Sequence, residues 1–146
     1  MATRVEWSVR DSHRPWTLCA VVASAAAVGL RVAGLPPVDV HGPLHYLGVM
    51  DPLCGGTRAA FLLLSGDAAG AARYNPIVFP LAAIAAGLLV RAGIGVACRR
   101  WLEIRLPAGW RRALLAALAV AVALLWIRQQ AEADLLTRAW AGAGVS

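Results

Sequence analysis

The segment DPLCGGTR, residues 51–58, and the loop before it carry the residue types with the greatest chemical potential. The candidate metal ligands here are His41, His45, Asp51 and Cys54. Thiolate, imidazole and carboxylate groups together suit zinc. However, glycine and proline lie between the two histidines and disturb the helical i, i+4 spacing that would align them. We therefore expect polar loop residues satisfied by their neighbours, with a metal site as the alternative.

The cysteines argue against disulfide chemistry. Cys19 and Cys98 fall near the inner ends of two apolar segments, about a bilayer thickness from Cys54. Bridged cysteines need Cα atoms within roughly 7 Å of each other, so neither can pair with Cys54. A single thiol also cannot hold a metal ion alone. We expect packed thiols and no cofactor.

A second candidate site is the start of the apolar segment that follows Cys54. Free backbone N–H groups at a helix start, together with an arginine, bind phosphate or carboxylate, and a lipid headgroup is the obvious anion at this depth. The tentative anion-binding residues are Gly55, Gly56, Thr57 and Arg58. The favoured alternative is structural: the glycines allow a sharp turn, Thr57 caps the helix, and Arg58 pairs with Asp51 or Asp67.

Enzymatic signatures are missing from the sequence. It has no Ser-His-Asp constellation, no HExxH, and no Walker or Rossmann glycine pattern. The apolar segments contain no acidic residue, so a proton relay or an ion pathway has no group to work with. We therefore expect a non-catalytic protein.

Three apolar segments must position these residues. The chain has 146 residues, 60% of them hydrophobic, and a mean hydropathy of +0.64, which excludes an ordinary soluble domain. Flanking arginines that snorkel and interfacial tryptophans extend the short apolar runs to spanning length, and we expect Arg91 to reach the headgroups in this way. The sequence predicts a single all-α integral membrane domain over 1–146. Its predicted elements are helices at 16–33, 76–98 and 111–130 and an outer loop at 34–75 that contains a re-entrant or interfacial half-helix.

The arginines predict the orientation. They concentrate before the first helix and between the second and third, so those two segments should face the cytoplasm, with the N-terminus inside and the C-terminus outside. The net charge of +6 is then topological, and we exclude nucleic acid as a partner. The use of arginine without lysine, with abundant alanine, suggests a bacterial plasma membrane protein.

The outer loop resembles a known family. The stretch LCGGTRAAFLLLSGDAAGAARYNP is similar to the core of a bacterial membrane family catalogued as domain of unknown function 2752. That family shows a Cys-Pro-x-Cys-Gly-x-Thr-Arg motif, an apolar half-helix, Gly-Asp, and Arg-Tyr-Asn-Pro. The similarity covers about residues 42–80. Its motif residues here are Pro52, Cys54, Gly55, Thr57, Arg58, Gly66, Asp67, Arg73, Tyr74, Asn75 and Pro76. Asp51 replaces the first cysteine of the motif, which weakens any thiol or metal chemistry that the resemblance implies.

The short Asp67-led segment should form a capped helix, and Asn75 and Pro76 should begin the second spanning helix. Small residues recur four apart on the spanning helices, which favours close helix contacts, although an alanine-rich composition also produces such pairs by chance. The third helix should continue outward with an apolar stripe that includes Leu135. The tentative partner-facing residues are Ala25, Gly29, Ala83, Gly87, Ala117, Ala121 and Leu135.

These observations favour an accessory or regulatory subunit docked in a larger envelope membrane assembly. Our leading hypothesis for that assembly is a lipid importer of the mammalian-cell-entry type, with permease or transporter subunits and membrane lipids as partners. The alternatives are a thiol- or metal-dependent membrane enzyme that uses the outer-loop cysteine and histidines, and a self-associating membrane anchor.

Overall fold

A computed structural model describes residues 4–34 and 49–137, and most of these residues are helical. Three helices are long and apolar enough to cross a membrane: α1 (Arg14–Ala33), α4 (Val78–Cys98) and α5 (Ala108–Ala131). They confirm the three predicted spans, with starts shifted by two or three residues and ends by at most one, and are those of a multi-pass membrane protein. Their apolar side chains remain largely exposed, as expected for surfaces that face lipid or another protein.

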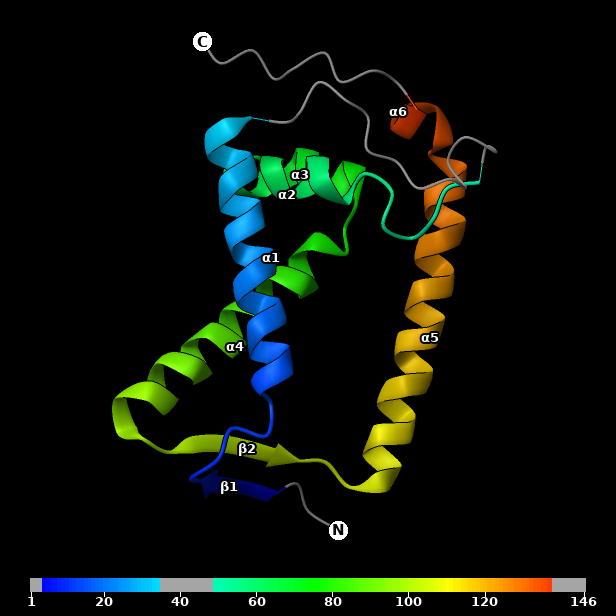
Figure 1. Ribbon diagram of the computed structural model, residues 1–146. Helices are drawn as coiled ribbons and strands as arrows, with labels where there is room; N and C mark the ends of the chain where they lie inside the picture. Colours follow the sequence, from blue (N-terminus) through cyan, green and yellow to red (C-terminus); the bar gives the residue numbers. More distant parts are fainter. Residues whose placement is uncertain (1–3, 35–48, 138–146) are drawn as a thin grey trace.

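Short elements lie at each end of the spans (Figure 1). At one end are the strands β1 (Arg4–Ser8) and β2 (Trp101–Arg105), which we call the sheet end. At the other are three short helices: α2 (Gly56–Leu64), α3 (Ala68–Tyr74) and α6 (Ala133–Thr137). We call this the motif end, because the DPLCGGTR and RYNP segments lie here.

The strands depart from the all-helical prediction. They pair antiparallel, with Val5 opposite Ile104 and Glu6 opposite Glu103. Two glutamates placed directly opposite each other repel. The guanidinium of Arg105 offsets this, because it lies 3.9 Å from the Glu6 carboxylate and 3.7 Å from that of Glu103. Hydrogen bonding from Ser12 lowers the pKa of Glu103, so this carboxylate remains charged at neutral pH.

Arg91 joins the sheet end to α4. Its Nη1 donates to Asp11 Oδ1 at 2.8 Å and its Nε to the Leu102 carbonyl at 2.6 Å, while its guanidinium lies 5.5 Å from the centre of the Trp101 ring. The expectation that Arg91 reaches the headgroups was wrong, because its side chain is only 12% exposed and pairs inside the protein. Trp101 packs against Gly95, where a Cβ would overlap the indole ring.

Replacing Asp11 by asparagine should destabilise the protein by about 3 kcal/mol, because it leaves the charge of Arg91 largely buried without its partner. The matched control is Glu6→Gln, whose exposed pair with Arg105 should contribute less than about 1 kcal/mol. Thermal or denaturant unfolding in a mild detergent measures both. Equal losses for the two variants would contradict a structural role for the Asp11–Arg91 pair.

The third span stands apart from the first two. α1 packs on α4, and α2 packs on α1, α3 and α4. In the described part of the chain, α5 has no packed interface with α1 or α4, and Figure 1 shows it on the other side of the molecule from both. Every residue from 108 to 121 is exposed. At one end the chain joins α5 to β2, and at the other the side chains of residues 128–130 bond it to the motif end.

Candidate functional site

The motif end contains the densest set of buried polar contacts, and it begins with a tight turn. Asp51 Oδ1 accepts a hydrogen bond from the Leu53 N–H at 2.7 Å, and its carbonyl accepts from the Cys54 N–H at 3.1 Å. Gly55 then adopts a left-handed conformation with φ of 75°. A Cβ at this glycine would lie 2.7 Å from Leu136 Cδ2 and 3.1 Å from the Tyr74 carbonyl oxygen. This position therefore requires glycine for both its backbone angle and its space.

The Cys54 side chain is buried beside the residue that replaces the first cysteine of the family motif. Its Sγ donates to Asp51 Oδ2 at 3.6 Å. Burial, with a smaller contribution from the negative charge of Asp51, raises the pKa of the Cys54 thiol. A raised pKa favours the thiol over the thiolate. The thiolate is the form that attacks substrates and binds metals.

Cys54 should therefore react slowly with alkylating agents in the folded protein. In a C19S/C98S variant, labelling at neutral pH should be about tenfold or more slower than in denaturing detergent. Because the raised pKa belongs to the folded state, the labelling rate of the folded variant should increase only above the pH at which an ordinary thiol ionises. The stability contributed by this thiol is full at neutral pH and is lost as the pH rises through that alkaline range. Rapid labelling of the folded variant at neutral pH would show an accessible, activated cysteine instead.

Asn75 is fully buried and binds the turn from the other side. Its Nδ2 donates to the carbonyls of Pro52 and Cys54, both at 2.9 Å, and its Oδ1 accepts from the Ile77 N–H at 3.1 Å. The prediction that Asn75 and Pro76 begin the second span was wrong by two residues. α4 begins at Val78, because Asn75 ends α3 in an extended conformation and its side chain turns the chain into α4.

The end of α5 completes the site. Gln129 is fully buried, and its Nε2 donates to the Cys54 carbonyl at 2.7 Å and to the Tyr74 carbonyl at 3.2 Å. Arg128 Nη2 donates to the carbonyls of Ala72 and Arg73 in the last turn of α3. Gln130 Oε1 accepts from the Met50 N–H at 3.0 Å. Sequence reasoning missed these three residues; the signal was the polar triplet RQQ directly after an apolar run.

The predicted anion-binding residues lie together at the start of α2, but their groups are partly committed inside the protein. Arg58 is only 7% exposed, its Nη1 donates to the Leu136 carbonyl at 3.3 Å, and its guanidinium lies 5.8 Å from the centre of the Tyr74 ring. The Gly56 N–H donates to the Leu53 carbonyl. Thr57 is exposed and does not cap α2, since the N-cap position is Gly55. Anion binding here stays a prediction.

The remaining motif residues shape the α2–α3 connection. α2 ends as predicted at Ser65-Gly66, with the Asp67 N–H donating to the Leu62 carbonyl at 2.9 Å and Gly66 in a left-handed conformation. The Asp67 carboxylate caps α3 by accepting from the Gly70 N–H at 2.8 Å, which confirms that prediction. Arg73 itself is exposed, and only its carbonyl takes part in the contact with α5.

The predicted metal cluster is only partly described, because His41 and His45 lie outside the described residues. Within residues 4–34 and 49–137, no group of three histidine, cysteine or acidic side chains is arranged to hold a metal ion.

Six of the predicted partner-facing residues, two on each span, point away from the interior. They are all exposed: Ala25, Gly29, Ala83, Gly87, Ala117 and Ala121. The seventh, Leu135, is only half-buried, and the neighbouring Leu136 is the fully buried residue. The predicted outward continuation of the third helix is interrupted at Glu132: α5 ends at Ala131, and a separate short helix, α6, follows at Ala133.

Comparison with known proteins gives one match. The model of a family described as "Protein of unknown function (DUF2752)" matches residues 43–89, which confirms the resemblance inferred from the motifs. No curated protein and no solved structure matches the chain. The matched segment covers the Cys54 turn, α2, α3 and the first half of α4, whereas Gln129 and its neighbours lie beyond it.

Proposed function

We propose, from the premise that residues 43–89 carry this family's segment, that the protein is a non-catalytic accessory subunit of a larger membrane assembly. The observation that carries the proposal is the isolation of α5. Helices associate in membranes through close packing, since lipid provides no hydrophobic drive between them. A helix exposed on every side from 108 to 121, and held by side-chain contacts at its far end, offers a partner a complete packing surface.

The polar contacts at the motif end support this role. They fix α2, α3 and the end of α5 to each other and enclose the Cys54 side chain, which is buried. Gly87 of α4 has open space around it, and Ala117 and Ala121 of α5 are exposed, so small-residue surfaces are accessible on two separated spans. A transmembrane helix from a permease could pack on either surface. Within this class, a lipid importer of the mammalian-cell-entry type in the bacterial plasma membrane remains the first assembly to test.

The test is purification of the chromosomally tagged full chain in a gentle detergent, followed by mass spectrometry of the proteins recovered. We expect permease or ATPase subunits in stoichiometric amounts. An A117L/A121L variant enlarges the exposed surface of α5 and should lose these subunits while unfolding at the same temperature as the wild type. The matched control is Leu114→Ala, which changes another exposed position of α5 without adding bulk.

Recovery of the protein alone as a monomer would contradict the subunit proposal. Recovery alone as a defined oligomer would support a self-associating anchor instead. The third hypothesis, a thiol-dependent enzyme, is separated by Cys54→Ser: an accessory subunit keeps its partners with serine at this position, whereas a thiol enzyme loses its activity. The raised pKa of the Cys54 thiol favours the first outcome.

A further inference from the structure

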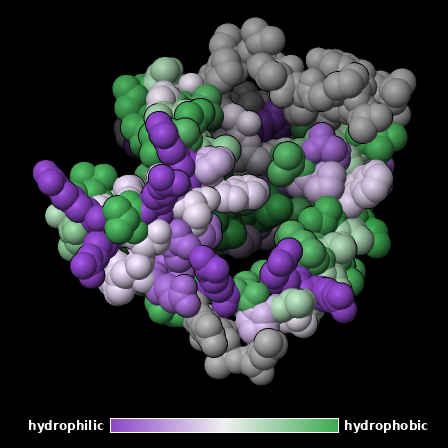
Figure 2. Space-filling view, turned by 60° about the horizontal axis from the view of Figure 1, so that its bottom comes forward, coloured by the Kyte–Doolittle hydropathy of each residue, from purple (hydrophilic) through white to green (hydrophobic). Residues whose placement is uncertain are grey.

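A cavity of about 570 Å³ opens at the sheet end, far from the motif residues. It lies between the first turns of α1 and the last turns of α4. Arg10 and Asp11, which precede α1, and Trp101, which follows α4 in β2, complete its lining. This volume is within the range of small-molecule binding sites. Figure 2, which brings this end forward, shows hydrophilic side chains gathered at this end of the molecule, with hydrophobic surface between them.

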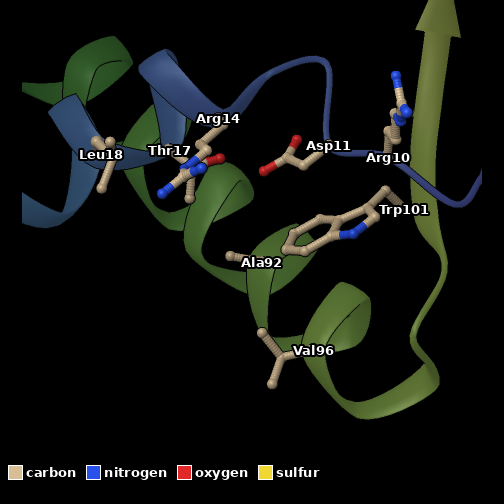
Figure 3. A pocket seen from close by; sticks show the side chains of 8 residues that line it. All are labelled: Arg10, Asp11, Arg14, Thr17, Leu18, Ala92, Val96 and Trp101. Atoms are coloured by element: carbon tan, nitrogen blue, oxygen red, sulfur yellow. The ribbon is translucent and has the colours of Figure 1, made fainter.

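The cavity lining has two chemically different parts (Figure 3). Arg10, Arg14 and Thr17 provide cationic and hydroxyl groups. The apolar part consists of Leu18 from α1, Ala92 and Val96 from α4, and the Trp101 ring, which lies between Asp11 and Ala92. A ligand that satisfies both parts has an anionic group joined to an apolar chain.

The charge balance leaves an excess of positive charge. Asp11 is the one acid that lines the cavity, and its Oδ1 already accepts from Arg91 Nη1 and from the His13 N–H. Its charge is therefore balanced by Arg91, which lies outside the lining. Neither Arg10 nor Arg14 forms an ion pair with an acid in residues 4–34 or 49–137. Figure 3 shows Arg10 and Arg14 on opposite sides of Asp11, with Arg14 beside Thr17. A guanidinium group without an acidic partner suits a phosphate, which accepts charge-assisted hydrogen bonds, and the second arginine adds positive charge nearby.

We propose that this cavity binds the phosphate group of an anionic phospholipid, with one acyl chain lying along Leu18 and Val96. The position agrees with the chemistry, because the cavity lies where two spans end and headgroups meet the hydrocarbon region. Arginines close to a span attract anionic lipids, which are abundant in the cytoplasmic leaflet. The proposal concerns a separate part of the molecule and does not depend on the accessory role.

The experiment uses the full chain in mild detergent with an equimolar mixture of phosphatidylglycerol and phosphatidylcholine, and native mass spectrometry counts the retained lipids. We expect one retained phosphatidylglycerol per chain. R10Q/R14Q should reduce its retention about tenfold, because the positive charge of the cavity wall, with its charge-assisted contact to the phosphate, is lost. The matched control R111Q/R112Q removes the same charge from the start of α5, outside the cavity, and should change retention less than about twofold.

Two further measurements complete the test. The first distinguishes a phospholipid from a free phosphate compound, and the second uses a variant that keeps both arginines. Glycerol phosphate in excess should not displace the lipid, since it has no chain to occupy the apolar part. Val96→Asp, at a 72% exposed position that the fold does not depend on, adds a negative charge to the wall and should also reduce retention with both arginines intact. Equal retention of phosphatidylcholine, displacement by glycerol phosphate, or wild-type retention by R10Q/R14Q would each overturn the proposal.

Discussion

Replacing Gly55 by alanine should destabilise the motif end by about 2–4 kcal/mol. Two costs combine. A residue with a Cβ pays roughly 1–2 kcal/mol for the left-handed conformation. The new methyl group would also overlap Leu136, a fully buried residue of α6, and approach the Tyr74 carbonyl. Relief of the overlap would displace α6 from the turn.

The control is the adjacent glycine. Gly56 is the first residue of α2, and a Cβ there meets no atom within 4 Å. Gly56→Ala should therefore leave stability unchanged or raise it by up to about 1 kcal/mol. Unfolding in mild detergent, monitored by circular dichroism, measures both variants. Similar effects from the two substitutions would contradict a specific requirement for glycine at position 55.

Replacing Asn75 by aspartate should cost about 3 kcal/mol or more at neutral pH, although the two side chains have nearly the same shape. Nδ2 donates to the carbonyls of Pro52 and Cys54, so a carboxylate oxygen in its place would face two acceptors in a fully buried site. The acceptor role of Oδ1 toward the Ile77 N–H would survive.

The pH dependence distinguishes this electrostatic cause from simple loss of packing. Burial and facing carbonyls would raise the pKa of the new carboxyl in the folded state, so the variant should regain stability as the pH falls and the group becomes protonated. Unfolding measured at about pH 5 and pH 7.5 provides the comparison. The matched substitution Asp67→Asn affects an exposed cap and should cost about 1 kcal/mol or less. A loss for Asn75→Asp that does not change with pH would contradict the proposed mechanism.

Local features of the sequence were sufficient to predict the spans and the α2–α3 connection. The apolar runs define the spans by length, and Ser65-Gly66-Asp67 contains both the end of α2 and the cap of α3. The strands could have been found as well, because RVEWS and the last four residues of WLEIR alternate apolar and polar residues. They were overlooked because their arginines were assigned only a topological role.

The contacts that complete the motif end could not have been predicted from the sequence. Gln129 and Cys54 are 75 residues apart, and one sequence gives no information about which distant polar residues meet. The break at Glu132, which brings Leu136 against Gly55, has no glycine or proline to mark it. The role of Arg91 was misjudged for the same reason: its partner Asp11 lies 80 residues away.

The dependence of the motif end on residues 128–130 has a consequence for biosynthesis. The Cys54 turn and the last turn of α3 emerge from the ribosome long before the side chains that satisfy their carbonyls. A nascent chain with only its first two spans inserted would lack the Arg128 donor to the last turn of α3 and the Gln129 donor to the Cys54 carbonyl, leaving that carbonyl with Asn75, a form that membrane proteases and insertion chaperones can recognise. Insertion of the third span would then serve as the final checkpoint of assembly, and chains truncated before Gln129 should be degraded rather than accumulate.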